Sequence, residues 1–416
     1  MIRVSEVAER SSRPPSGGKP RILVPSIGNP VRSVNGASTY TREMDRWLRS
    51  PPLEAELCFL PLPVLPPVRH RLRQSFSLVR SLVSKLPAKA IFARSRRMST
   101  AVRREIRGGG YDLVLLNGTD LLWLLDEVPG SLPVAVVAHN IEHRLYDAQV
   151  TSAAWLPEPF RNHLKRDAQR LARYELDGMK RAGNVIALSA DDAAYVEQRC
   201  AGLHTLVLPP AFSYNPHPRK PPPRANEILD IGFVGNFAWW PNQQGLDWFL
   251  KRVFAHLDGH VRLHLFGEQS DNGARPDGVV AHGYVPDLGE VLGQCHFMIC
   301  PILGGGGVSI KAAEAIYNRV PILATPFGVR GLPLVEDPAI VVRETPQDWV
   351  RFLGSAAAHE LAQRSVLEIN SRRFLHEDRV KALQSYVLRA MGRDRSPGDR
   401  SYVPAQQSTD YSDSRR

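Results

Sequence analysis

The fold is decided by the stretch FMICPILGGGGVSIKAAEAIYNRVPILAT, residues 297–325. It reads as an apolar strand, a glycine loop, a helix and a second apolar strand, which is the order of a parallel βαβ unit. The glycine loop, residues 304–307, follows the carboxyl end of a strand and leads into a helix. Free backbone N–H groups and the helix dipole favour an anion at such a place. The stretch therefore predicts a phosphate or diphosphate site in an α/β domain.

Two charged residues of the helix, Lys311 and Glu314, add detail to this prediction. They are three residues apart and so share one helical face. Lys311 can bring a full positive charge to the anion, whereas the Glu314 carboxylate suits the hydroxyls of a sugar or ribose diol. Together they indicate a nucleotide diphosphate-sugar. The stretch by itself also allows a surface loop followed by an ordinary ion pair on a solvated helix.

Outward from this stretch, short apolar runs alternate with helical segments along most of the chain. The predicted strands of the first half are 21–27, 112–117, 133–139, 184–189 and 204–210, and those of the second half are 231–235, 262–267, 279–285, 297–301, 320–325 and 339–343. This alternation implies mostly parallel sheets with both faces covered by helices. We expect an α/β protein of two doubly wound, Rossmann-like domains that face each other across a cleft, with ligands beyond the carboxyl ends of the strands.

Composition gives the expected domain boundaries. We predict a disordered lead over 1–19, an N-terminal domain over 20–208, a proline-rich linker over 209–226, a C-terminal domain over 227–375, a terminal helix over 376–393 and a disordered tail over 394–416. Seven prolines in the linker segment exclude regular structure there. The long helix before the fourth predicted strand should end at Gly183, because glycine is the usual helix stop.

The chain of 416 residues carries a net charge of +11, with 43% hydrophobic residues. The charge favours a polyanionic partner, which could be nucleic acid, a nucleotide or a membrane surface. The four cysteines show no C-x-x-C spacing, so a zinc site or disulfide framework is not expected. The N-terminus lacks the apolar region of a signal peptide, and no apolar run reaches the about 18 residues needed to span a bilayer. These features favour a cytoplasmic location.

Several segments resemble family 4 glycosyltransferases with the GT-B fold. The segment GGGGVSIKAAEAIYNRVPILATPFGVRGL, residues 304–332, is similar to the donor-site signature of that family. The segments IGFVGNFAWWPNQQGLDWF, LHLFGE and GYVPDLGEVLGQCHFMICP resemble its second-domain strands, and NGASTYTREM and VAHNIEHRLY resemble its acceptor-side loops. The resemblance extends over residues 21–390 and is strongest over 231–333.

The resemblance implies a glycosyltransferase that moves a sugar from a nucleotide-sugar donor to a polysaccharide or lipid-linked acceptor. It implies retention of anomeric configuration, no metal ion and no cofactor. The N-terminal domain would take the acceptor and the C-terminal domain the nucleotide-sugar. Catalytic roles would fall to His139, Lys311 and Glu314, and donor or nucleotide binding to Gly36, Asn236, Gly305, Gly306, Gly307, Val308, Lys311 and Glu314.

Some of these residues also have ordinary structural interpretations. Gly36 could be a simple turn glycine, and His139 could be a hydrogen-bonded histidine at a strand end. Glu142 and His143 are better explained as solvated or structural residues than as catalytic ones. These alternatives stay open at the level of sequence.

The chain departs from the family pattern at three places. Gly306 stands where many members have a first glutamate, and the uncharged Asn236 and Gln244 stand where many have an arginine and a lysine. Lys311, and after it Arg330, would then have to balance the charge of the diphosphate. The departures also support an alternative, a catalytically degraded GT-B domain that acts as a membrane-associated binding or scaffold subunit. A sugar-nucleotide epimerase on the same fold is a less favoured second alternative.

A basic block over residues 67–107 holds twelve Lys or Arg residues and one acid, Glu105, a net charge of +11 that equals that of the whole chain. Its apolar residues recur near helical spacing: Leu72, Phe76, Leu78, Val79, Leu82, Val83 and Leu86. Such a segment can lie on an anionic membrane, which would place the protein on the inner face of the cytoplasmic membrane. The alternative is a core-facing helix with a solvated basic face. Nucleic acid is not expected, because the block lacks a binding motif or an aromatic stacking platform.

Overall fold

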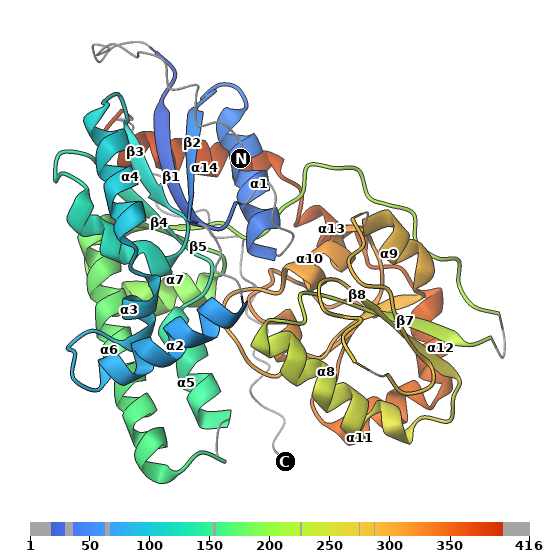
Figure 1. Cartoon of the computed structure of the whole chain (residues 1–416). Coiled ribbons are helices and arrows are strands. Elements are labelled where there is room, and N and C mark those ends of the chain that lie inside the picture. The colour runs from blue at the N-terminus through green and yellow to red at the C-terminus, as the bar shows by residue number, and fades with distance from the viewer. Residues whose placement is uncertain are drawn as a thin grey trace, which may run out of the picture.

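The computed structural model describes residues 18–29, 36–62, 67–152, 155–224, 227–273, 275–286 and 288–393. The predicted lead, apart from its last two residues, and the predicted tail over 394–416 lie outside the described residues. Two domains, each built on a six-stranded parallel sheet with helices on both faces, lie side by side (Figure 1). The prediction of two doubly wound α/β domains is therefore confirmed.

The N-terminal domain has the strand order β2-β1-β3-β4-β5-β6. Its strands are β1 (Arg21–Ile27), β2 (Glu56–Leu62), β3 (Leu113–Leu116), β4 (Val134–Ala138), β5 (Gly183–Ala187) and β6 (His204–Val207). Its helices are α1 (Gly36–Arg49), α2 (Pro67–Ser81), α3 (Ala88–Ala93), α4 (Arg96–Arg107), the 3₁₀ segment η1 (Thr119–Glu127), α5 (Glu142–Ser152), α6 (Glu158–Ala182) and α7 (Ala190–Glu197). The sequence analysis did not predict β2, which pairs only with β1 at the sheet edge. An edge strand tolerates Pro61, because one side of its backbone needs no ladder partner.

The C-terminal domain has the strand order β12-β11-β10-β7-β8-β9. Its strands are β7 (Leu229–Val234), β8 (Val261–Phe266), β9 (Val279–Ala281), β10 (Phe297–Cys300), β11 (Ile322–Ala324) and β12 (Ile340–Val342). Its helical segments are α8 (Trp240–Arg252), η2 (Phe254–His256), α9 (Leu288–Gln294), α10 (Ile310–Tyr317), η3 (Phe327–Val329), α11 (Pro346–Leu353), α12 (Ala356–Gln363) and α13 (Glu368–Arg372). The strand order reverses between β7 and β10, and the loops after these strands form the crevice where such sheets bind ligands.

Local sequence explains the main elements. β3 and β4 are uninterrupted apolar runs, LVLL and VAVVA, and every residue of both strands is buried. Such runs are typical of parallel strands that are covered on both faces. The long helix α6 ends at Gly183, which has a left-handed conformation with φ of 77° and donates its backbone N–H to the carbonyl of Met179. This is the predicted glycine stop.

The last helix, α14 (Glu377–Ala390), returns to the N-terminal domain and packs beside α1 (Figure 1). Its Gln384 amide donates to the carbonyls of Trp47 at 2.7 Å and Ser50 at 2.9 Å. The Tyr386 hydroxyl donates to the carbonyl of His204 at 2.7 Å. The chain thus passes between the domains twice, so two connections hold the C-terminal domain.

The two connections lie next to each other. In the proline-rich segment, the Phe212 N–H donates to the carbonyl of Phe374 at 2.9 Å, just before the chain enters α14. Paired connections of this kind favour rotation of the domains about one line over free separation. No helix among the described residues is both long enough and apolar enough to cross a membrane.

Candidate functional site

A cavity of about 680 Å³ lies between the domains, at the carboxyl ends of their strands. The residues predicted for the site all line it: Gly36, His139, Asn236, Gly305, Gly306, Gly307, Val308, Lys311 and Glu314. They come from four segments, namely the start of α1, the end of β4, the loop after β7, and the glycine loop with α10. The tertiary structure therefore brings together residues that lie as far apart in sequence as positions 36 and 314.

The glycine loop is bare backbone that touches the opposite domain. A Cβ added to Gly307, whose φ is +64°, would lie 2.1 Å from the carbonyl oxygen of His139. A Cβ added to Gly306 would lie 2.8 Å from the Cβ of Asn140. Side chains at these positions would thus collide with the end of β4. The two domains can approach this closely only because the loop has no side chains there.

The start of α10 faces the start of α1 across the cavity. A Cβ added to Gly36 would lie 3.1 Å from Cγ1 of Ile310. The N-cap residue of α10, Ser309, makes no capping hydrogen bond with its side chain. The first backbone N–H groups of α10 therefore need partners other than a side-chain cap, and a ligand anion in the cavity can provide them.

Lys311 carries its charge into the cavity wall without an acidic partner. Its Nζ donates to Oδ1 of Asn242 and lies 5.0 Å from the ring centroid of Phe233. Within the described part of the chain, no carboxylate lies at ion-pair distance from Lys311. Burial lowers its pKa, and the charge of Glu314 acts in the opposite direction. The ammonium group is thus positioned by neutral groups, which leaves its charge for a ligand.

Glu314 lies one turn further along the same wall of the cavity. Burial raises the pKa of Glu314 to about 7, Arg42 and Lys311 oppose this shift, and the nearby Glu43 adds to it. The Glu314 side chain makes no hydrogen bond with any described residue. Its oxygens are therefore available to accept hydrogen bonds from ligand hydroxyls.

His139 is a neutral imidazole at the end of β4. Its Nε2 lies 2.8 Å from Oδ1 of Asn117, an oxygen that also accepts the Thr41 hydroxyl at 3.2 Å. An acceptor at Nε2 places the ring proton there and leaves Nδ1 as an unprotonated acceptor. This Nδ1 is buried and has no hydrogen-bond partner among the described atoms. Burial lowers the pKa of His139 to about 4, and the charge of Glu142 acts in the opposite direction.

Two polar residues that the sequence analysis discussed, Arg330 and Gln244, lie outside the cavity wall. Arg330, expected as the second cation for a diphosphate, donates instead to the carbonyl of Gly307 at 2.9 Å and lies 3.7 Å from Asp192 of α7. It holds the glycine loop against the N-terminal domain. Gln244 is likewise not among the lining residues, and Asn242, two positions earlier on α8, contacts Lys311 in its place.

The sequence analysis missed several polar residues that line the cavity: Arg42, Glu43, Arg46, Asn140, Asn242 and Glu268. Arg42 and Arg46 lie one turn apart on α1, the helix that begins at Gly36. This spacing is a signal that could have found them. No sequence pattern near Glu268 indicates a site residue. Glu268 follows β8 and accepts a hydrogen bond at 2.5 Å from Asn236, which follows β7, so only the pairing of these two strands brings it to the cavity.

Comparisons with known proteins agree with this geometry. Residues 229–358 match the family model described as "Glycosyl transferases group 1". TarM from S. aureus is similar in structure, with a TM-score of 0.59 and 9% identity over 90% of this chain and 99% of TarM. The lipopolysaccharide outer core galactosyltransferase WaaB has a TM-score of 0.53 and 12% identity over 89% of this chain and 99% of WaaB. HepE from Anabaena, in complex with UDP-glucose, has a TM-score of 0.55 and 14% identity over 89% of this chain and 99% of HepE.

These structural likenesses establish the fold, which is GT-B. No curated protein sequence matches the chain significantly. The family match covers the domain that holds the glycine loop, Lys311 and Glu314. The C-terminal domain thus matches the group 1 glycosyltransferases over residues 229–358, and the chain as a whole has the GT-B fold.

The close packing of the glycine loop gives a direct test. Gly307→Ala should push the loop away from His139, because the new Cβ would overlap the His139 carbonyl oxygen. Displacement of a site by about 1 Å can cost about 100-fold in rate, and we expect a loss of this size in kcat/KM. Small-angle scattering should show a larger radius of gyration.

The matched control is Gly304→Ala, in the same loop, where an added Cβ meets nothing within 4 Å. It should behave like the wild type. If Gly307→Ala keeps full activity and the same scattering curve, the loop does not set the distance between the domains.

Proposed function

We propose that the enzyme transfers a sugar from a nucleotide-sugar donor to a polysaccharide or lipid-linked acceptor, with retention of anomeric configuration and without a metal ion. The observation that carries this proposal is the cavity between the domains. It combines the glycine loop, an unpaired lysine and a carboxylate without a hydrogen-bond partner, and it faces the other domain. HepE, a protein of the same fold, has been solved in complex with UDP-glucose.

The diphosphate of the donor would bind at the start of α10. There the loop N–H groups and the helix dipole supply partial positive charge, and Lys311 supplies a full charge. Negative charge grows on the departing diphosphate as the glycosidic bond breaks, so Lys311 would stabilise the transition state more than the ground state. With this charge in place, the neutral Asn236 does not prevent the reaction. In this proposal the diphosphate also helps to deprotonate the acceptor hydroxyl.

Glu314 would accept hydrogen bonds from the two ribose hydroxyls of the nucleotide. Its carboxylate has no hydrogen-bond partner among the described residues and lies one helical turn beyond the proposed diphosphate site. Hydrogen bonds to a charged group are worth about 1.5–3 kcal/mol each, enough to decide nucleotide affinity. Gly36 would approach the diphosphate from the N-terminal domain, where a side chain would fill the space.

His139 would contact the transferred sugar. Its buried Nδ1 is an acceptor without a partner, so a sugar hydroxyl that donates to it would satisfy the nitrogen. Because its pKa is about 4, the ring stays neutral at physiological pH and acts by positioning the sugar.

The pKa of Glu314 leads to a pH-dependent donor affinity. With a pKa of about 7, the carboxylate is mostly protonated at pH 6 and mostly ionised at pH 8. If the donor binds the ionised form, its apparent Kd should rise about tenfold as the pH falls from 8 to 6. His139 does not titrate in this range. Calorimetric titration with UDP-, GDP- and ADP-sugars should measure the effect and identify the base.

In the same titrations, Glu314→Gln should bind donor more weakly than the wild type and with no pH dependence. A wild-type affinity that stays constant from pH 6 to pH 8, or full turnover by Glu314→Ala, would contradict the assignment of Glu314.

Lys311→Ala should lower kcat by about 100-fold or more, as the loss of one preorganised charge in other enzymes does. Steady-state kinetics should show the fall mainly in kcat, because the leaving-group charge develops in the transition state. The control is Lys251→Ala. Lys251 is an exposed residue of α8 that pairs with Asp247, so its replacement should leave kcat unchanged. A large loss of kcat for Asn236→Ala, with no loss for Lys311→Ala, would show that Lys311 is not the cation that stabilises the leaving diphosphate.

The basic block supports a location at the inner surface of the cytoplasmic membrane. Leu72, Phe76, Val79 and Val83 recur with helical spacing, and their exposed fractions are 67%, 59%, 65% and 90%. We call these four residues the apolar stripe. Its exposure contradicts the alternative of a core-facing helix. Arginines flank the stripe, so an anionic bilayer would complement both its apolar and its charged parts.

Replacement of Leu72, Phe76 and Val79 by Ser should reduce sedimentation with anionic vesicles, and the reduction should persist at high salt, where electrostatic binding is screened. The matched control is the replacement by Ser of Leu367 and Ile369, two exposed apolar residues of the C-terminal domain. Donor hydrolysis should be unchanged in both variants. A wild-type protein that does not sediment at low salt would favour a soluble acceptor.

A further inference from the structure

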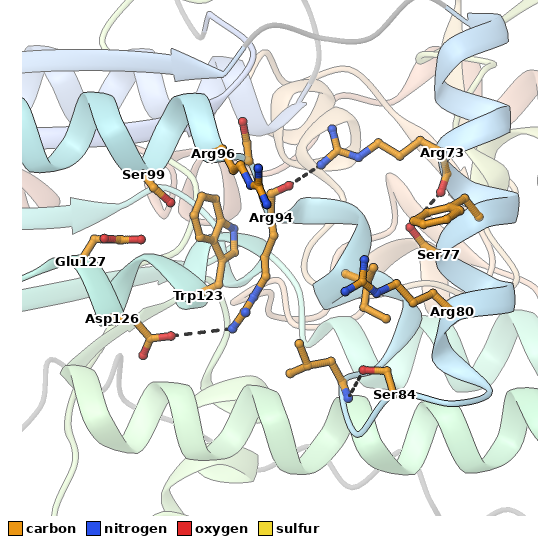
Figure 2. A pocket seen from close by; sticks show the side chains of 14 residues that line it. Arg73, Ser77, Arg80, Ser84, Arg94, Arg96, Ser99, Trp123, Asp126 and Glu127 are labelled. Atoms are coloured by element: carbon orange, nitrogen blue, oxygen red, sulfur yellow. Dashed lines mark hydrogen bonds and ion pairs between the residues drawn. The ribbon is translucent and has the colours of Figure 1, made fainter.

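A second cavity, of about 470 Å³, lies in the N-terminal domain beneath α2 (Figure 2). It shares no lining residue with the cavity between the domains. Its walls come from α2, the turn after α2, α3, α4 and η1: Arg73, Phe76, Ser77, Arg80, Ser84, Leu86, Ile91, Arg94, Ser95, Arg96, Ser99, Trp123, Asp126 and Glu127. We call it the α2 pocket. The reaction proposed above does not use it.

The acids of the α2 pocket are already paired. Asp126 lies 2.8 Å from Arg181 and 3.7 Å from Arg94, the pair drawn in Figure 2. Glu127 lies 3.2 Å from Arg103 of α4. Neither carboxylate is therefore left to balance the other arginines of the pocket.

The remaining arginines carry uncompensated charge. Arg73 donates to the backbone carbonyl of Arg94 and has no acidic partner in the described part of the chain (Figure 2). No hydrogen bond or ion pair joins the side chain of Arg80 or Arg96 to another described residue. Three guanidinium groups thus line one cavity with no carboxylate of their own. A bound anion would complement them, since guanidinium groups match phosphate geometry with paired hydrogen bonds.

Trp123 adds an independent sign of a ligand. Its side chain is only 5% exposed, yet its indole N–H is buried and has no acceptor among the described residues. Figure 2 shows the indole nitrogen on the side of the ring that faces Arg94. A buried donor without a partner costs about 1–3 kcal/mol, which an acceptor from a ligand would recover. The indole N–H and the guanidinium groups are all donors, so the ligand must be an acceptor.

The α2 pocket lies directly beside the apolar stripe. Each residue of the apolar stripe is followed in sequence by a residue that lines the pocket. These lining residues are Arg73, Ser77, Arg80 and Ser84. The two rows are therefore adjacent along α2 and the turn that follows it, and Phe76 belongs to both. A ligand that fills the pocket has its apolar part next to the stripe. This arrangement fits a ligand with an anionic head and an apolar tail.

We propose that the α2 pocket binds the headgroup phosphate of an anionic phospholipid while the apolar stripe enters the acyl region of the same leaflet. This proposal rests on the membrane association proposed above and adds a defined phosphate site to it. A volume of about 470 Å³ holds a phosphate with a small headgroup such as glycerol. A specific site of this kind binds more tightly than diffuse charge attraction, because several guanidinium groups line one cavity and can contact the same phosphate.

Two double variants of equal charge test the proposal. Arg80→Ser with Arg96→Ser removes the free cations of the α2 pocket. Arg71→Ser with Arg97→Ser removes two exposed cations from α2 and α4 that do not line it. Binding to phosphatidylglycerol vesicles at physiological salt should fall about tenfold more in the first variant. Equal losses in both variants would show that attraction is diffuse and would overturn the proposal.

A Trp123→Phe variant separates ligand binding from stability. It removes the unpartnered N–H together with the five-membered part of the indole, and it keeps a six-membered aromatic ring in the core. Vesicle binding should fall about threefold or more while the protein stays folded at the assay temperature, which thermal unfolding checks. Unchanged vesicle binding in this variant would remove Trp123 from the site.

Soluble glycerol 3-phosphate and inorganic phosphate identify the source of the phosphate. Both should bind the wild type at least 100-fold more weakly than the vesicles, and binding should vanish in Arg80→Ser with Arg96→Ser. Soluble phosphates that bind as tightly as vesicles would overturn the lipid assignment in favour of a free metabolite. Donor hydrolysis should be normal in every variant, so failure of the donor site and failure of the α2 pocket give different results.

Discussion

The contact between the glycine loop and the end of β4 is the constraint on which the cleft depends. Gly306 and Gly307 bring backbone against Asn140 and His139 with no room for a side chain. Arg330 fixes this contact, because it binds the loop carbonyl and lies near the buried Asp192 of the other domain. The cavity can therefore combine Lys311 from one domain with His139 from the other.

Charge in the cleft is balanced differently from the pattern that the family resemblance suggests. Two neutral residues, Asn236 and Gln244, stand where cations were expected, and only Asn236 reaches the cavity. Lys311 is held by an amide and an aromatic ring, and Arg42 enters from the opposite domain near Glu314. The positive charge of the cleft thus comes from both domains, so the electrostatic potential in the cleft depends on how the two domains are placed.

The helix α6 fixes the segment that carries the α2 pocket and the apolar stripe. Its Arg170 donates to the carbonyls of Ser81 at 2.8 Å and Ser84 at 2.7 Å, and its Asp167 accepts the N–H of Ala88 at 3.0 Å. These bonds fix the turn after α2 against the domain body. The fixed turn orients α2, so that arginines of the helix line the α2 pocket and the apolar stripe faces outward.

The sequence by itself determined the features that are local: eleven of the twelve strands, the helix stop at Gly183, and the glycine loop with Lys311 and Glu314 one turn apart. Apolar runs, glycine and helical spacing act over a few residues, so they can be read without a fold. The tertiary structure alone decided that Asn242 and Glu268 reach the cleft, and that Arg330 does not. The tertiary structure also decided which face of α2 is buried. The sequence pattern shows that apolar residues recur along the helix, but the hydrogen bonds from α6 decide that these residues face away from the domain.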